Sequence, residues 1–221
     1  MLPQTLSVTP NLIPWLTMIG FGAYHGLNPG MGWLFALSLG LQRRSERAIW
    51  ISLLPITVGH AGSLFLIGVL ILAGFRFISS DVLQLFTGML LIGFGIYKVF
   101  RYYRHPRWVG MKVGMRDLTR WSFLMAIAHG AGLMIAPALL NIAAPAHAGH
   151  QMAGNSSGAV LLGIALHTGA MLLMMSVVAW FVYRRFGLAV LRQKWINFDL
   201  IWAVALIIVG GISLLQHFPA G

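Results

Sequence analysis

Apolar residues run along this chain in long stretches separated by short polar connections. The stretches lie at 12–41, 49–75, 82–102, 121–144, 159–183 and 199–217. A helix needs about 20 mostly apolar residues to cross a bilayer, and each stretch is close to that length or longer. The pattern therefore predicts an all-α membrane protein with six transmembrane helices, forming a single domain over residues 1–221.

The first apolar stretch contains a break in its own pattern. The segment YHGLNPGMGW, residues 24–33, places a histidine, an asparagine, a proline and three glycines inside an apolar run. Backbone groups freed by such residues are tolerated in a membrane only where they line a cavity or bond to protein. We expect the first helix, and in the same way the fourth, to be interrupted. The backbone positions expected at these breaks are Pro29, Gly30, Gly130, Gly132 and Pro137.

Composition supports the same class of protein. The chain is 58% hydrophobic and only 9% charged, whereas about a quarter of the residues in a soluble domain are charged. The chain has no cysteine, which excludes thiol–disulfide electron carriers, iron–sulfur proteins and cysteine-ligated metals.

The positions of the basic residues predict the orientation. All of the 15 lysine and arginine residues except Arg76 lie in the connections after the first, third and fifth spans. Since basic loops stay in the cytoplasm, these connections are predicted to be cytoplasmic, with a basic linker at 103–120 and both termini outside. The compact build favours a bacterial inner membrane. The net charge of +11 is then explained by topology and by contact with anionic lipids at the cytoplasmic face, without nucleic acid.

The two halves of the chain, 12–102 and 121–217, carry similar features in the same order. The first span of each half has His-Gly followed by a proline, the second has a histidine with a glycine two residues later, and the third is rich in glycine. Because each half has three spans, the second would enter the membrane from the opposite face. We therefore expect two inverted three-helix repeats, an architecture whose binding sites lie near the midplane at the repeat interface.

Four histidines fall near the middle of predicted spans: His25, His60, His129 and His167. A polar group in lipid is costly unless it has a partner, so such residues face the bundle interior or a water-filled path. They could simply bond to neighbouring helices, or they could ligate a transition metal or carry protons. Asn28 offers an amide oxygen and Met31 a soft sulfur nearby. No span contains an Asp or Glu beyond its first residue, so Mg²⁺ and Ca²⁺ lack an oxygen cage.

A second candidate site lies in the connection between the fourth and fifth spans. The segment HAGHQM places His147, His150 and Met152 close together in a stretch of small residues. This spacing suits chelation, and the segment is predicted to lie outside, so it could capture a metal such as copper.

Two segments resemble the signatures of a known group of transporters. YHGLNPGM resembles the first signature of the nickel/cobalt transporters and urease-accessory membrane proteins, and VGHAGSLFLIG resembles their second. The resemblance implies the fold of the lysine-exporter-like superfamily, with six spans in two inverted triplets. It assigns His25 and His60 to the signature histidines, with His129 and His167 as their second-half counterparts.

The chain departs from that family after the proline. It has Gly30 and Met31 where the family usually has an aspartate and a histidine, so a site here should bind nickel or cobalt less strongly. The resemblance therefore implies the fold and a transport function, and it leaves the cargo open.

Taken together, the sequence predicts a transporter of a transition-metal cation, with copper or zinc favoured slightly over nickel. One alternative is an exporter of a small anion or amino-acid-like solute. Another is a non-transporting subunit or assembly factor that binds a partner or haem, with His60 and His167 as axial ligands. No nucleophile–base or carboxylate pair occurs in the spans, so an enzyme is not expected and no resident cofactor is required. The sequence leaves open whether the chain works alone, as a homo-oligomer or in a membrane complex.

Overall fold

The chain folds entirely into helices wherever its structure is described. The computed structural model describes residues 12–74, 77–100, 114–143, 156–186 and 198–217, and this part has no strand. The elements in chain order are α1 (Ile13–Leu27), the short 3₁₀ helix η1 (Pro29–Met31), α2 (Trp33–Arg43), α3 (Glu46–Gly74), α4 (Ser80–Phe100), α5 (Met115–His129), α6 (Ala131–Ala143), α7 (Ser156–Arg185) and α8 (Phe198–His217). The all-α prediction is confirmed.

Several of these helices are suited to a bilayer. α3, α4 and most of α7 are long and apolar enough to cross a membrane, and α5 with α6 qualifies as a fourth, bent span. The apolar part of α8, Leu200–Leu215, is shorter. Large hydrophobic side chains also cover the outside of the bundle: Leu54 is 66%, Leu124 62% and Leu173 67% exposed. A surface of this kind fits lipid rather than water, so the chain is a membrane protein.

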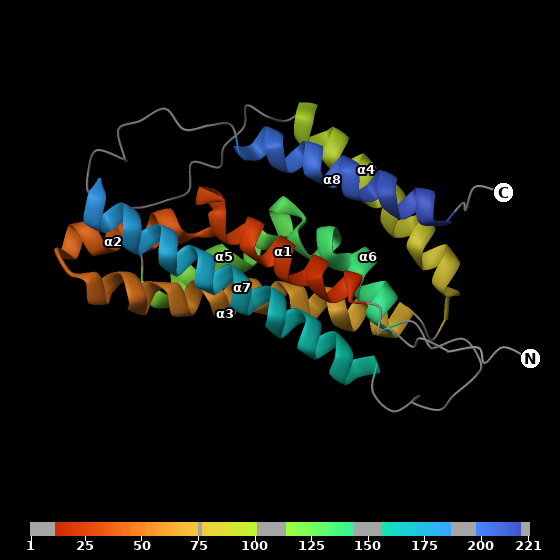
Figure 1. Ribbon diagram of the computed structural model, residues 1–221, viewed down its shortest axis with the longest axis horizontal. Helices are drawn as coiled ribbons and strands as arrows, with labels where there is room; N and C mark the ends of the chain where they lie inside the picture. Colours follow the sequence, from red (N-terminus) through yellow and green to blue (C-terminus); the bar gives the residue numbers. More distant parts are fainter. Residues whose placement is uncertain (1–11, 75–76, 101–113, 144–155, 187–197, 218–221) are drawn as a thin grey trace, which may run out of the picture.

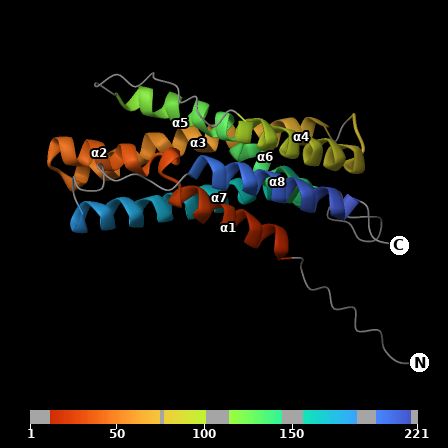
Figure 2. The same ribbon diagram turned by 90° about the horizontal axis from the view of Figure 1, so that it is seen from above.

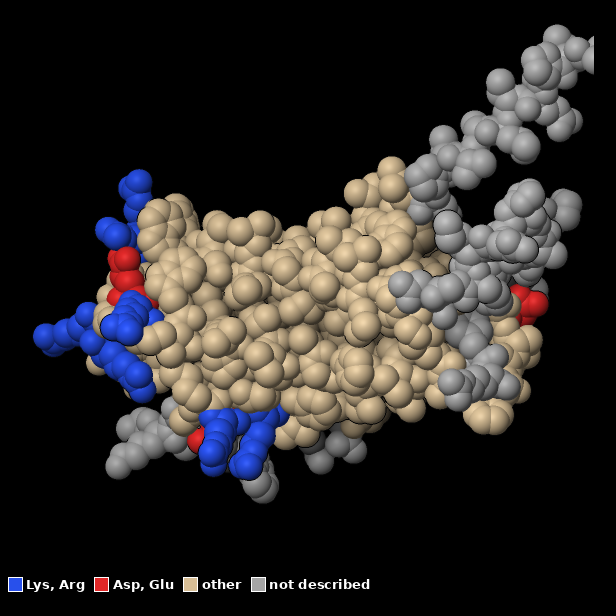
Figure 3. All heavy atoms as spheres, turned by 90° about the horizontal axis from the view of Figure 1, so that it is seen from below, with Lys and Arg blue, Asp and Glu red and all other residues tan. Residues whose placement is uncertain are grey.

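The helices form an elongated bundle. They run roughly along its long axis, and α4 lies against α8 on one side (Figures 1 and 2). The other principal pairs are α1 with α7 and α3 with α5, while α6 fits between α3, α4 and α7. Lys and Arg side chains gather at one end of the bundle in the face shown in Figure 3. That end includes the last turns of α2 and α7, with Arg43, Arg184 and Arg185.

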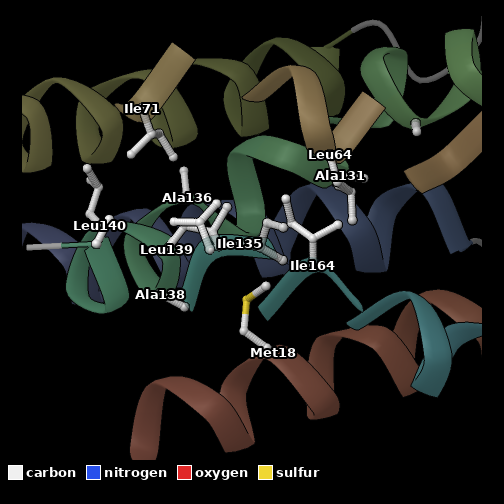
Figure 4. Packing of buried hydrophobic residues seen from close by; sticks show 13 residues of the cluster. Met18, Leu64, Ile71, Ala131, Ile135, Ala136, Ala138, Leu139, Leu140 and Ile164 are labelled. Carbon is white, nitrogen blue, oxygen red and sulfur yellow. The ribbon is translucent and has the colours of Figure 1, made fainter. Parts of the chain in front are cut away.

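An apolar core holds the central helices together. Met18 of α1, Leu64 of α3, Ile135 and Leu139 of α6 and Ile164 of α7 belong to one buried cluster (Figure 4). Each of these side chains except Ile164 is completely buried. Because the cluster draws on four helices, it fixes α1, α3 and α7 around α6.

Two glycines let helices approach more closely than other residues would allow. A Cβ on Gly22 of α1 would lie 2.2 Å from the carbonyl oxygen of His167 on α7. A Cβ on Gly59 of α3 would lie 2.2 Å from the carbonyl oxygen of Thr119 on α5. Each glycine precedes a histidine, His25 or His60, so the close contacts set where these two imidazoles lie.

The first apolar stretch is interrupted where the sequence predicts. α1 ends at Leu27, and Asn28 adopts an extended conformation whose Oδ1 accepts a hydrogen bond from the Gly30 amide, 2.9 Å away. The indole nitrogen of Trp33 donates to the Leu27 carbonyl oxygen at 3.0 Å. The break is therefore closed by protein groups, as a membrane requires.

The fourth span bends at a single residue. Gly130 has a left-handed φ of +70°, and the direction of the helix changes by 69° between α5 and α6. Gly132 and Pro137, also expected at this break, instead lie inside α6. A proline lacks the amide hydrogen that would bond to the carbonyl four residues earlier, but the helix continues through it.

The predicted linker at 103–120 lies mostly outside the described residues. Its last part differs from the prediction, because Met115 to Arg120 form the beginning of α5. The Asp117 carboxylate accepts a hydrogen bond from the Gly114 amide at 3.1 Å, which starts the helix. The basic residues Arg116 and Arg120 therefore lie on a helix.

Candidate metal site

Three histidines from three different helices meet in the middle of the bundle. His25 of α1, His60 of α3 and His167 of α7 place their ligand atoms within 4.8 Å of one another. The ring centroids lie 5.4 Å apart for His25 and His60, and 4.8 Å apart for His25 and His167. All three side chains are at most 1% exposed. We call these residues the histidine triad.

Backbone hydrogen bonds orient two of the rings. Nδ1 of His25 lies 2.6 Å from the Phe21 carbonyl oxygen, and Nδ1 of His167 lies 3.1 Å from the Met18 carbonyl oxygen on α1. Since a carbonyl can only accept, Nδ1 must carry the proton in both rings. Each Nε2 then has a free lone pair. Metal-binding histidines are typically fixed in this way, with the second nitrogen donating to a backbone carbonyl.

The Nε2 atoms of all three triad histidines are buried and have no hydrogen-bond partner in the described part of the chain. Leaving one buried polar atom unsatisfied costs about 1–3 kcal/mol, so such atoms need an explanation. Three such atoms on imidazoles that lie together are explained at once if they share a ligand. A neutral imidazole Nε2 is a good ligand for Zn, Cu, Fe or Ni.

The triad needs a small contraction to bind an ion. Metal–nitrogen bonds of about 2.0–2.1 Å place three ligand atoms about 3.5 Å apart in a trigonal arrangement. The triad atoms spread over as much as 4.8 Å, so they would have to close by about 1 Å.

The fourth histidine lies apart from the triad. Nδ1 of His129, on α5, is 3.0 Å from the Met125 carbonyl oxygen, and the His129 ring centroid is 6.4 Å from that of Trp202. Its Nε2 lies 3.8 Å from the place where a Cβ on Gly30 would be. His129 therefore faces the first helix break.

Asn28 and Met31 are not part of the triad either. The Asn28 side-chain oxygen accepts the hydrogen bond of Gly30 within the turn, so its role is to close the break. Met31 is buried in an apolar cluster with Leu91, Met134 and Trp202. Both residues thus shape the break between α1 and α2. The other predicted metal ligands, His147, His150 and Met152, lie outside the described residues.

The structure adds two aromatic residues that the sequence did not point to. Trp202 of α8 is fully buried and meets the His25 ring edge-on, with centroids 4.4 Å apart. Its indole nitrogen donates to the His129 carbonyl oxygen, and Tyr24 stacks on its face at 5.4 Å. A buried tryptophan needs a partner for its N–H, so a tryptophan within the apolar run of α8 was the available signal.

A groove reaches Tyr24, the outer ring of this aromatic pair. Its volume is 770 Å³, and residues of α1, α6 and α8 line it, including Ile13, Tyr24, Asn141 and Ser213. Ile13 begins α1, whereas Asn141 and Ser213 lie near the ends of α6 and α8, so the groove extends from that end of the bundle to Tyr24. Trp202, stacked on Tyr24, lies next to the triad. The two aromatic rings therefore separate the groove from the histidines.

No protein-family model, curated protein or solved structure matches this chain. The function must therefore be derived from the geometry of the triad and its surroundings.

Proposed function

We propose that this protein is a bacterial inner-membrane transporter of a transition-metal cation, which binds at His25, His60 and His167. The observation that carries the proposal is the convergence of three buried imidazoles, each with an Nε2 atom that has no partner in the described part of the chain. Two of the three rings are already held in the tautomer that presents Nε2 to a metal.

The burial of the triad and the nearby groove both suit a path for an ion through the bundle. The triad is buried at the crossing of α1, α3 and α7, and an apolar core excludes water on one side. The groove leads toward it from the end opposite the basic side chains, with Tyr24 and Trp202 between the groove and the triad. In this proposal the groove is the outer half of the path.

The helix packing supports the proposal of inverted repeats. If α1–α4 correspond to α5–α8, exchanging the halves turns the α1–α7 contact into the α5–α3 contact, and both are principal contacts of the bundle. The same exchange turns the α2–α7 contact into α6–α3, which is also present, and leaves the α4–α8 pair unchanged. The triad takes two histidines from the first half and one from the second, as a site at a repeat interface would.

The proposal counts six passages through the membrane. The interrupted pair α1–α2 and the bent pair α5–α6 each make one passage, and α3, α4, α7 and α8 make the others. The end rich in Lys and Arg would then face the cytoplasm, with both termini on the opposite side. The resemblance to nickel/cobalt transporters fits a cation as cargo.

The geometry gives less support to the other candidate functions. An anion would need the Nε2 atoms to be protonated, and three positive rings whose ligand atoms lie within 4.8 Å of one another would repel strongly in a dry site. A haem between His60 and His167 would need open space for its macrocycle, yet these rings are stacked 5.7 Å apart with His25 beside both. A single small ion fits the arrangement better.

A binding and flux experiment tests the proposal. Purified protein would be titrated with Cu(I), Zn(II), Ni(II) and Co(II), and metal uptake would be measured in proteoliposomes. We expect one ion per chain, and an affinity that falls by more than about 100-fold in His60→Ala and His167→Ala, because even second-shell changes cost up to that much. His129→Ala removes a buried imidazole outside the triad and should keep the ion. Absence of binding and uptake in the wild type would refute the proposal.

A further inference from the structure

The charge around the histidine triad limits which ion it can hold. The buried polar side chains in the described part of the chain are histidine, asparagine, serine and threonine, with no carboxylate among them. The chain has only four acidic residues, Glu46, Asp81, Asp117 and Asp199. Each of them belongs to the first turn of a helix. His60 is 14 residues from Glu46 along α3, which corresponds to about 21 Å.

A neutral ligand set favours a low ionic charge. The free-energy cost of moving an ion from water to a dry interior increases with the square of its charge, and only opposite charges or strong ligands offset it. Three neutral imidazoles would leave Zn²⁺, Ni²⁺ or Co²⁺ with two uncompensated charges. Cu⁺ would leave one, and three ligands can complete its coordination.

Sulfur side chains lie on both sides of the triad along α7. Met171 and Met175 follow His167 by four and eight residues, so they share its face of α7. Met18 precedes His25 by seven residues on α1, and its carbonyl oxygen accepts the His167 hydrogen bond. All three methionines are completely buried. Figure 4 shows the Met18 side chain pointing from α1 into the bundle.

Methionine is a common filler of apolar cores, but its position here is specific. Met18 packs with α6 and α7, whereas Met171 and Met175 pack with α2 and α3, so the thioethers lie on either side of the triad along α7. Thioether sulfur is a soft ligand that selects Cu(I) and binds hard divalent ions poorly. The charge of the site and the chemistry of its neighbours thus point to the same ion.

We infer that the cargo is Cu(I), and that Met18, Met171 and Met175 continue its path from the triad along α7. This inference rests on the proposed transport function and specifies its substrate. On the α7 side, the path would run from the triad toward the basic end of the bundle, where α7 ends at Arg185.

Competition titrations test the identity of the ion. Anaerobic protein would be titrated with Cu(I), kept reduced by ascorbate, against bicinchoninate, and with Zn(II) against a chromogenic chelator. We expect the affinity for Cu(I) to exceed that for Zn(II), Ni(II) and Co(II) by at least about 100-fold. Tighter binding of a divalent ion at the triad would overturn the Cu(I) assignment while leaving metal transport intact. Binding of no metal would overturn both.

A charge control tests Asp199, the acidic residue nearest to Trp202 in the sequence. Asp199 precedes Trp202 by three residues on α8, and its side chain lies outside the described residues. Asp199→Asn should leave Cu(I) affinity unchanged. A loss of more than about tenfold would mean that a carboxylate neutralises the ion, and it would remove the basis for preferring a monovalent cation.

Matched methionine variants test the path. Met171→Leu and Met175→Leu keep the volume of the side chain and remove the sulfur. Met89→Leu makes the same change on α4, where the side chain is 53% exposed. In proteoliposomes we expect Cu(I) flux to fall by about tenfold in the first two variants, with stoichiometric Cu(I) binding retained, and to stay at the wild-type rate in Met89→Leu. Equal flux in all three would show that the sulfurs only fill the core.

Discussion

Single glycines decide how closely the triad histidines can approach. Gly22 is one turn before His25, and its Cα faces the carbonyl oxygen of His167 across the α1–α7 contact. A backbone oxygen cannot move aside as the end of a flexible side chain can, so any side chain at this position must push the two helices apart. The geometry of the site therefore depends on a residue that has no chemistry of its own.

Gly22→Ala should lower both stability and metal affinity. Its Cβ would lie 2.2 Å from the His167 oxygen, and overpacking of this kind costs about 1–3 kcal/mol. The change would also move His25 away from His167. Gly20→Ala is the matched control, since nothing lies within 4 Å of a Cβ there. Thermal unfolding in detergent and metal titration measure the two effects, and equal behaviour of the two variants would contradict this account.

Gly130 carries a conformational requirement as well as a spatial one. Its φ of +70° costs a non-glycine residue about 1–2 kcal/mol, and a Cβ would lie 2.8 Å from the Phe94 ring. We therefore expect Gly130→Ala to lower the free energy of unfolding by at least that amount. Gly211→Ala, in open space on α8, should not. A melting temperature for Gly130→Ala equal to that of Gly211→Ala would show that the bend is not fixed by this residue.

At the scale of elements, the first break is a compact turn held by its own side chains. Asn28 caps η1 through the Gly30 amide, and Trp33 bonds to the last carbonyl of α1. α1 and α2 are thus separate helices connected by a defined turn. His129, at the bend between α5 and α6, lies next to Gly30 in this turn. The break between α1 and α2 and the bend between α5 and α6 are therefore in contact.

Asn28→Ala should destabilise the turn between α1 and α2. The lost cap costs about 1 kcal/mol, because the Gly30 amide is left without its acceptor. Asn28→Ser keeps a short oxygen acceptor and should recover part of the loss. Urea-induced unfolding in mild detergent compares the three proteins. A Ser variant no more stable than the Ala variant would indicate that packing of the amide, rather than its hydrogen bond, supports the turn.

Most of the helices and their breaks could be predicted from the pattern of the sequence. Long apolar runs indicated helices, and Asn28-Pro29-Gly30 indicated the first break. The second break was less certain, because Gly130, Gly132 and Pro137 are equally plausible breakers in a sequence. Only the packing against Phe94 and the left-handed φ at Gly130 distinguish them. The helical start at Met115 was also missed, since the basic residues around it resemble a linker.

The candidate site could be predicted only in part from the sequence. Polar residues in apolar spans must find a place inside the bundle, so the histidines could be singled out. Which of them meet depends on helix rotation and crossing, which a sequence does not state. His129 therefore could not be separated from the triad beforehand. Trp202 could not be assigned to His25, because its contact joins residues that lie far apart in the chain.

At the scale of the whole molecule, charge divides the bundle into two ends. Basic side chains gather at one end, where Arg184 of α7 also pairs with Glu46 of α3. The opposite end carries the mouth of the groove and the connection between α3 and α4. If the positive-inside rule sets the orientation, these ends face different compartments.

Cysteine labelling can measure this orientation directly, since the chain contains no cysteine of its own. Gln42→Cys would place a thiol at the basic end and Ser79→Cys one at the other, both at exposed positions. In intact cells, a membrane-impermeant maleimide should label Ser79→Cys alone, and Gln42→Cys only after permeabilisation. Labelling of both from the same side would contradict the proposed topology.

The contact between Trp202 and His25 has an optical consequence. The indole ring lies 4.4 Å from the imidazole and interacts electrostatically with a cation placed near it. An ion that arrives at the triad therefore changes the environment of a rigid, dry fluorophore. The chain has 8 tryptophans, but the difference between the emission of the wild type and that of Trp202→Phe isolates this one. The protein thus contains its own reporter, with which the filling and emptying of the triad can be followed in real time without any added dye.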